Sequence, residues 1–398
     1  MTRIAITGIG VVAPGAVGIE AFAKMMCQGR PATAVIDRFD TAESRAHTAA
    51  LVRDFPARDF IPPLKLRRMN TLSRYAVAAA RLALDDRGGP LAAESGVAAG
   101  TVFGPVQTSA DYMHDYVEKG AALAPPQLFA ESVANAPGSH VAIEFGLRGF
   151  NVTFTQRESS ALAALMYGAA QIARGAVPSA MIGGVEEVNE IVFNVLDSIG
   201  ALAHAEEGIE ECARPFDRRR NGMVFGEGSA MIVAEAEPRR APYAWISGFG
   251  IARDRTASIS DWGEGHDAVV AAMRAAIDDA GLSLSDIDAI YASANSTRRA
   301  DRLEYRAIQS LFHHVPAVVG TKGVFGEYAA AGALQLVAAI LALRDQTLHA
   351  TAGFGSGNDE MRFVPVRQTT PGPLHHILVN SISAGGGIVC AVLSREAA

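Results

Sequence analysis

Two glutamates are candidates for chemistry. Glu158 and Glu327 each precede an Ala- and Leu-rich stretch of helical period, and a basic residue lies close to each of them, Arg157 and Lys322. Carboxylates that share a pocket raise the pKa of one of them, so the two glutamates are a candidate acid/base pair. The alternative is that each is an acid in the first turn of a helix, where it contributes about 0.3–1 kcal/mol by complementing the helix dipole.

Other residue types that perform chemistry lack the spacing that they need. Cys27, Cys212 and Cys390 form no CxxC pair and are odd in number, which argues against a disulfide framework and a zinc site and indicates a reducing compartment. GxSxG and HExxH motifs are absent, so hydrolase and zincin chemistry has no support. We therefore expect neither a metal nor a cofactor.

Charge and length limit the partners. The 398 residues carry a net charge of −7 and no run of five like charges, which argues against nucleic acid and an anionic membrane surface as ligands. No apolar window of about 18 uncharged residues is present, and the N-terminus runs directly into a strand-like stretch. We expect a soluble cytoplasmic protein.

The elements that must position the glutamates follow an α/β pattern. Ala-rich helical stretches alternate with short β-branched runs, at residues 3–12, 97–103, 152–155, 180–183 and 230–234. The helical stretch 75–88 resembles 267–281, and the stretches after Glu158 and Glu327 form a second match in the same order. Two matches in one order predict a duplicated chain, with halves 1–240 and 241–398.

A longer motif is more specific. Residues 213–229 read ARPFDRRRNGMVFGEGS and closely resemble the RPFD…GEGA signature of the β-ketoacyl-acyl-carrier-protein synthases. The resemblance covers almost the whole chain, through residues 5–13, 68–86, 146–151, 173–187, 320–327 and 380–387. It implies the α/β fold of the thiolase superfamily, a five-layer αβαβα arrangement made of two duplicated halves.

The family's catalytic side chains are missing at the matching positions. Such enzymes use a cysteine at a helix N-terminus, where the helix dipole favours thiolate, and two histidines that bind the thioester carbonyl. Here Glu158 lies at the cysteine position, Ser293 at the first histidine and Glu327 at the second, while Lys322 is retained. Ala384 replaces an aromatic gate in the glycine-rich C-terminal loop.

This combination resembles the chain-length factors of type II polyketide systems, including aryl-polyene pathways. The resemblance implies a catalytically inactive subunit that forms a heterodimer with an active ketosynthase, shapes its acyl tunnel and meets acyl carrier protein through the complex. Strand 151–156, with Asn151, Thr153 and Thr155, is expected at the partner interface.

Segment 104–129 is expected at the same interface. Five of its side chains are candidates for the end of the tunnel, although each could equally belong to the core: Thr108, Tyr112, Met113, Tyr116 and Phe129.

Three hypotheses follow. The first is a non-catalytic partner subunit, with Glu158 and Glu327 filling the old pocket. The second is an enzyme with chemistry rebuilt on these two carboxylates. The third is a homodimeric protein that binds acyl groups or carrier protein. We favour the first, because no thiolate or imidazole remains at the three catalytic positions.

Overall fold

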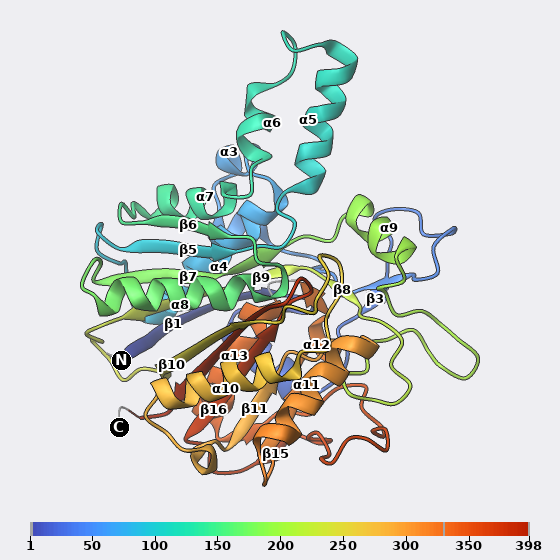
Figure 1. Cartoon of the computed structure of the whole chain (residues 1–398). Coiled ribbons are helices and arrows are strands. Elements are labelled where there is room, and N and C mark those ends of the chain that lie inside the picture. The colour runs from blue at the N-terminus through green and yellow to red at the C-terminus, as the bar shows by residue number, and fades with distance from the viewer. Residues whose placement is uncertain (1–2, 329–330, 397–398) are drawn as a thin grey trace.

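A computed structural model describes residues 3–328 and 331–396 of the chain (Figure 1). Ten strands of an 11-stranded mixed sheet follow one hydrogen-bonded path, and β2 (Ala16–Val17) pairs with β1 beside it. In path order the first five are β6 (Asn151–Phe154), β5 (Gly96–Gly100), β7 (Ser179–Glu186), β9 (Gly228–Glu235) and β1 (Ile4–Ala13). The next five are β10 (Ala244–Arg253), β17 (Gly387–Ser394), β16 (His376–Ile382), β11 (Ala289–Ala292) and β12 (Ala317–Gly320).

The strand order confirms the duplication. The first half contributes β1-β9-β7-β5-β6 and the second β10-β17-β16-β11-β12, so in chain order the strands of each half lie first, fifth, fourth, second and third. The halves join where Ile4 of β1 pairs with Ile246 of β10. Each half also has a strand glycine at the point where a helix packs most closely on the sheet. A Cβ at Gly10 would lie 1.9 Å from the Ala79 carbonyl oxygen, and a Cβ at Gly250 would lie 1.9 Å from that of Ala272. Only glycine allows a helix to approach a strand so closely.

Helices complete the predicted five layers. The helices α4 (Thr71–Arg87) and α7 (Ala136–Phe145) pack on the first half of the sheet, and α10 (His266–Asp279) and α11 (Arg298–Leu311) pack on the second. Between the halves lie α8 (Ser160–Ala173) and α13 (Ala331–Asp345), which contact each other. The predicted strands and both repeated helices are confirmed, with ends shifted by a few residues.

Shorter elements connect these layers. The helices are α1 (Ile19–Gln28), α2 (Ala57–Phe60), α3 (Pro63–Leu66), α9 (Glu190–Ser198), α12 (Lys322–Phe325) and the 3₁₀ turns η1 (Arg157–Ser159) and η2 (Leu284–Asp286). The short strands are β3 (Ala34–Val35), β4 (Thr48–Ala49), β8 (Phe225–Gly226), β13 (Glu327–Tyr328), β14 (Thr347–Leu348) and β15 (Thr370–Pro371). Within the described residues, no helix has the length and apolar character needed to cross a membrane.

One expectation about the glutamates is wrong. Glu158 lies in η1, which leads directly into α8, but Glu327 does not stand in the first turn of a helix. It lies in β13, and its backbone N–H donates to the Val224 carbonyl at 2.8 Å. The flanking residues Gly326 and Tyr328 have φ values of 81° and 71°, which no helix accommodates. Helix-dipole complementarity therefore does not explain Glu327.

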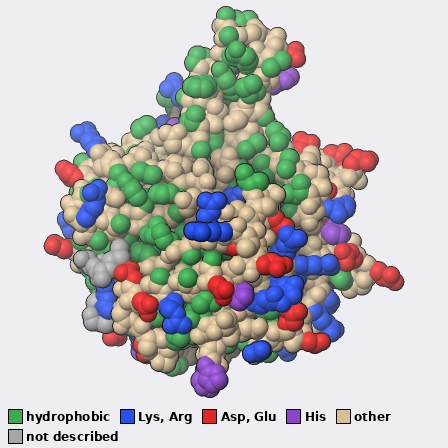
Figure 2. Space-filling view, viewed as in Figure 1, with side chains coloured by type: hydrophobic (Ala, Val, Ile, Leu, Met, Phe, Trp, Pro, Cys, Tyr) green, Lys and Arg blue, Asp and Glu red, His purple; other side chains and the backbone are tan. Residues whose placement is uncertain are grey.

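The segment predicted to reach a partner forms an arm. Its helices α5 (Val106–Lys119) and α6 (Pro126–Glu131) protrude from the body of the molecule (Figure 1). Apolar side chains gather on this arm in Figure 2, and Met113, Tyr116 and Phe129 are 52%, 44% and 57% exposed. The alternative that these three belong to the core is therefore wrong. Tyr112 and Thr108 are half-buried, and the Tyr112 ring lies 5.5 Å from that of Phe129.

Candidate functional site

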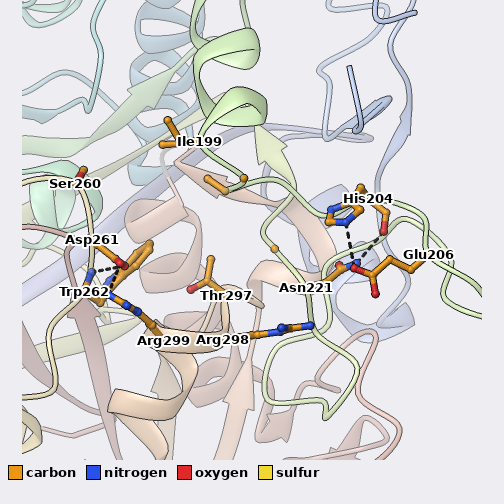
Figure 3. Close-up of a pocket in the computed structure, with 13 residues that line it drawn as sticks. Ile199, His204, Glu206, Asn221, Ser260, Asp261, Trp262, Thr297, Arg298 and Arg299 are labelled. Carbon is orange, nitrogen blue, oxygen red and sulfur yellow. Dashed lines mark hydrogen bonds and ion pairs between the residues drawn. The ribbon is translucent and has the colours of Figure 1, made fainter. Parts of the chain in front are cut away.

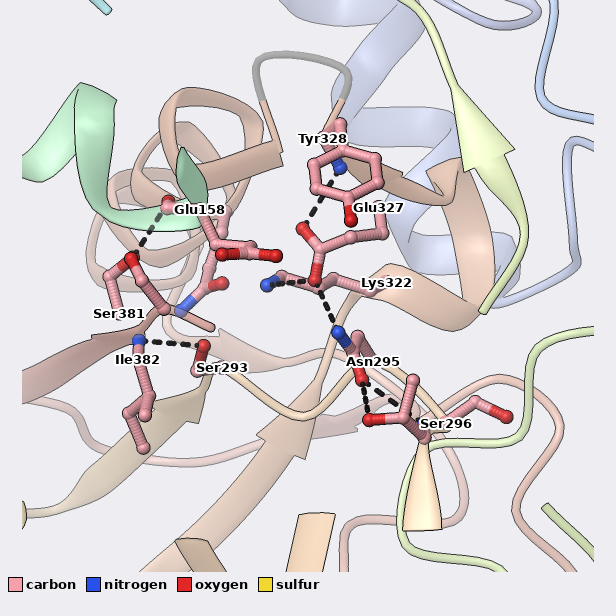
Figure 4. Close-up of polar contacts among 12 residues, drawn as sticks. Glu158, Ser293, Asn295, Ser296, Lys322, Glu327, Tyr328, Ser381 and Ile382 are labelled. Carbon is pink, nitrogen blue, oxygen red and sulfur yellow. Dashed lines mark hydrogen bonds and ion pairs between the residues drawn. The ribbon is translucent and has the colours of Figure 1, made fainter. Parts of the chain in front are cut away.

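Glu158 is buried (Figure 4), and its carboxyl contacts the glycine-rich C-terminal loop. Its Oε2 accepts a hydrogen bond from the backbone N–H of Ala384 at 3.1 Å, and its own carbonyl accepts one from Ser381 Oγ at 2.9 Å. Oε1 has no hydrogen-bond partner among the residues that the structure describes. The Glu158 carboxyl thus occupies a backbone donor of the kind that would otherwise bind an oxygen of a ligand.

Lys322 and Glu327 form a buried ion pair next to it. Lys322 Nζ lies 2.7 Å from Glu327 Oε2, and the two side chains are 2% and 1% exposed. The same oxygen accepts from Asn295 Nδ2 at 2.8 Å, while Oε1 accepts from the Tyr328 backbone N–H at 2.9 Å. Figure 4 shows the Glu158, Lys322 and Glu327 side chains directed toward one another. Both oxygens of Glu327 are therefore already satisfied by the protein.

Ser293 completes the set from the second half of the chain. Its hydroxyl accepts from the Ile382 backbone N–H at 3.0 Å, and its own N–H donates to Glu304 Oε1 at 2.9 Å. Asn380 Nδ2 donates to the same Glu304 oxygen at 3.0 Å. The structure therefore brings Ser293, Glu158, Lys322, Glu327 and Ala384 to one buried region. The Ser293 hydroxyl is therefore bonded to the end of β16, which leads into the C-terminal loop.

The cluster contains more acid than base. Burial, followed by the nearby Glu327 carboxylate, raises the pKa of Glu158 to about 7, although its backbone hydrogen bond, Lys322 and Arg157 oppose the shift. Burial and the same two carboxylates raise the pKa of Tyr328 well above its usual value. Glu158 therefore holds its proton up to near-neutral pH, and the single Lys322 ammonium is matched by Glu327.

Little space remains around these groups. The cavity beside Glu158 has a volume of about 10 Å³, which is close to the least that a single water requires. Its wall includes Arg157, Ser160 and Tyr328. A substrate carbonyl could reach Glu158 only after the surrounding chain had moved.

A larger pocket opens nearby but does not reach the cluster. It has a volume of about 450 Å³, and its lining residues include Trp262, Thr297 and Arg299 (Figure 3). Thr297 Oγ1 donates to Asn295 Oδ1 at 2.8 Å, so one polar side chain separates this pocket from Glu327. Among the described residues that line it, none belongs to the Glu158 cluster.

Three members of the cluster were missed from the sequence. Asn295 follows Ser293 by two residues, so spacing offered a weak signal for it, whereas Glu304 lies on α11, eleven residues after Ser293. Nothing in the sequence pattern pointed to Tyr328. In the described part of the chain, no group of three or more His, Cys, Asp or Glu side chains is arranged to hold a metal ion.

The expected interface residues lie apart from this cluster, on the sheet edge. Asn151 and Thr153 belong to β6, and Thr155 follows it. β6 pairs with β5, and no described strand pairs with its other edge. Thr153 Oγ1 has no hydrogen-bond partner among the described residues. An unpaired edge of this kind is available for a strand from another chain.

Replacing Glu158 by glutamine is expected to stabilise the protein in a pH-dependent way. The folded chain holds the Glu158 proton more tightly than the unfolded chain, so the cost of ionising it is absent below about pH 4.5 and complete above about pH 7. Glutamine cannot ionise, and its amide oxygen can still accept the Ala384 N–H. We expect Glu158→Gln to raise the free energy of unfolding by about 3 kcal/mol at pH 8 and by far less at pH 5.

Urea unfolding at both pH values measures this difference. The exposed Glu94→Gln is the matched control and should show no such pH dependence. An equal effect of Glu158→Gln at pH 5 and pH 8 would contradict a raised pKa of Glu158.

Comparisons with known proteins identify the family of this chain. Residues 1–238 match the family described as beta-ketoacyl synthase, N-terminal domain, and residues 243–355 match its C-terminal domain. The tetracenomycin polyketide synthase ketoacyl synthase alpha subunit of Streptomyces glaucescens is 31% identical over 386 residues, covering 91% of this chain and 90% of that protein. 3-Oxoacyl-[acyl-carrier-protein] synthase 2 of Coxiella burnetii is 29% identical, covering 99% and 98%. The solved ishigamide ketosynthase/chain length factor superposes with a TM-score of 0.91 at 27% identity, covering 100% of both chains.

Proposed function

Because this chain belongs to the β-ketoacyl synthase family of the thiolase-like superfamily, we propose that it is a chain-length factor. In this role it catalyses no acyl transfer alone, forms a heterodimer with an active ketosynthase and shapes the acyl tunnel of a type II polyketide or aryl-polyene pathway. Acyl carrier protein then binds the complex of the two subunits. One observation carries the proposal: the position of the nucleophile is filled by Glu158, inside a cluster with almost no free volume.

The surface supports a partner subunit. The unpaired edge of β6 and the exposed apolar side chains of the arm belong to the same half of the chain. Strand addition supplies main-chain hydrogen bonds, and burial of apolar side chains supplies most of the affinity. Both features suit a second ketosynthase-fold chain.

Rebuilt carboxylate chemistry is the second candidate. The pKa of about 7 for Glu158 favours it, since a general acid or base works best near the ambient pH. The small cavity and the satisfied oxygens of Glu327 oppose it. This candidate requires an activity that Glu158→Gln or Glu327→Gln abolishes.

Co-purification with candidate ketosynthases separates the hypotheses. A chain-length factor should form a one-to-one heterodimer, detected by light scattering after size-exclusion chromatography. Phe129→Asp, on the arm, should weaken that complex, whereas Val195→Asp, which changes an equally exposed residue on α9, should not. A stable homodimer that retains an acyl ligand and ignores every ketosynthase would favour the third hypothesis instead.

The isolated chain should not become acylated. Neither a thiolate nor an imidazole is present among the described residues that line the Glu158 cavity, and a carboxylate gives no comparably stable acyl intermediate. Intact-mass spectrometry after incubation with acyl- or malonyl-carrier protein should show the unmodified mass and no decarboxylation. A stoichiometric adduct on residues 158–160 would overturn the non-catalytic role.

Glu158→Cys alone should not create a condensing enzyme. A cysteine there would lack imidazole donors for the thioester carbonyl, because Ser293 and Glu327 remain at the histidine positions. The assay is product formation from acyl- and malonyl-carrier protein, with an active family member as the positive control. Measurable condensation by the single variant would show that the rest of the pocket is competent.

A further inference from the structure

A second opening lies on the outer side of the glycine-rich loop. It is a groove of about 470 Å³ between the end of β6 and the start of β17, within the size range of small-molecule sites. The loop that forms its inner wall includes Ala384, whose N–H is bonded to Glu158 on the other side. The Ala384 N–H thus joins the groove wall to Glu158, and Arg157 lines both the groove and the Glu158 cavity.

One part of the groove is apolar. Its lining consists of Met166, Ile251, Ile259, Ile388 and Val389. Two of these side chains are largely exposed, Ile251 at 61% and Ile259 at 84%. Exposure of such large aliphatic side chains to water is unfavourable. An apolar group that covers them therefore gains binding free energy.

The other part is basic. Arg157 and Arg253 line the groove, and none of the described lining residues is acidic. Neither guanidinium makes a hydrogen bond or an ion pair with any residue that the structure describes, although Arg157 is half-buried. Arg157 has a φ of 51°, and its side chain lies along the loop, where a Cβ on Gly385 would be 3.9 Å from its Cδ. The Glu158 carboxyl interacts electrostatically with Arg157, but it is already bonded to the Ala384 N–H.

We propose that this groove binds an amphipathic carboxylate, with the carboxylate on Arg157 and Arg253 and a linear apolar chain along Ile251, Ile259 and Met166. The planar fork of a guanidinium matches the two oxygens of a carboxylate, and a flexible chain fits a shallow aliphatic surface. The site goes beyond the proposed function. One chain supplies every residue named, but the groove also includes Thr155 and Gln156 of the strand expected at the partner interface, so the isolated chain is the form in which it is tested.

Isothermal titration of the isolated chain with decanoate tests the proposal. Acetate and decanol are the matched ligands that lack the chain and the charge, and each should bind at least about tenfold more weakly than decanoate. Decyl phosphate tests the head group, and because a guanidinium also pairs with phosphate it should bind more tightly than decanol.

Three variants test the residues. Arg253→Gln, at an exposed position, should weaken decanoate binding about tenfold, and Arg157→Gln should do the same if circular dichroism shows it folded. Arg174→Gln is the control, since Arg174 bonds Gln171 outside the groove and should leave the affinity unchanged. The proposal is overturned if decanoate does not bind, if decanol binds as tightly, if decyl phosphate binds no better than decanol, or if Arg253→Gln has no effect.

Discussion

Tyr112→Ala or Phe129→Ala, in a reconstituted complex with the partner ketosynthase, is expected to lengthen the acyl product. These rings contact each other on the arm, and under the proposed function they meet the distal end of a chain anchored on the partner. Overpacking costs about 1–3 kcal/mol, which is enough to change the ratio of products about 5- to 150-fold. Thr108→Trp adds volume on the same helix and should shorten the product.

Mass spectrometry of the released products measures this change, and the rates of the first condensations should stay almost constant. Glu118→Gln is the control, because this exposed residue of α5 lies outside the proposed tunnel end. An unchanged length distribution in all three variants, with the heterodimer intact, would place length control elsewhere in the complex.

Lys322→Met is expected to destabilise the isolated chain by about 3–5 kcal/mol, since it leaves the buried Glu327 carboxylate without its counter-ion. The loss should shrink as the pH falls, because protonation of the orphaned carboxyl removes the unpaired charge. Denaturant unfolding at pH 8 and pH 5 measures both statements.

A double variant provides the internal check. Lys322→Met combined with Glu327→Gln removes both charges and should recover most of the lost stability. Lys119→Met breaks an exposed ion pair of similar length, with Asp115, and should cost less than about 1 kcal/mol. If Lys322→Met cost no more than Lys119→Met, the buried pair would contribute nothing to stability.

Much of the fold could be predicted from the sequence, because its signals are local or repeated. Alternation of β-branched runs with Ala-rich stretches located the strands, and the matched pairs of stretches predicted two halves. The structure then shows that the two halves share one strand order. The error at Glu327 arose where tertiary structure overrides local pattern. A positive φ at Tyr328 is strained for a non-glycine residue, and nothing in the sequence encodes it.

The residues of the candidate site could be predicted from the sequence, but the contacts between them could not. Aligned motifs named Glu158, Ser293 and Glu327, which lie far apart in the chain. The bond from Ala384 N–H to Glu158 joins positions 226 residues apart, so no spacing rule could reveal it. The guanidinium of Arg157 was equally invisible, because only three-dimensional structure shows that none of the described residues forms a hydrogen bond or ion pair with it.

The junction of β1 and β10 has a consequence for how this chain folds. One hydrogen-bonded sheet runs through both copies of the duplicated unit, and α13, from the second copy, contacts β7 and β9 of the first. Because α13 is apolar on every side, the second copy alone would expose that helix to water, while the first copy alone would lose the cover of its sheet. Each half therefore needs the other to cover its apolar surface, and carrying both halves in one chain keeps them together.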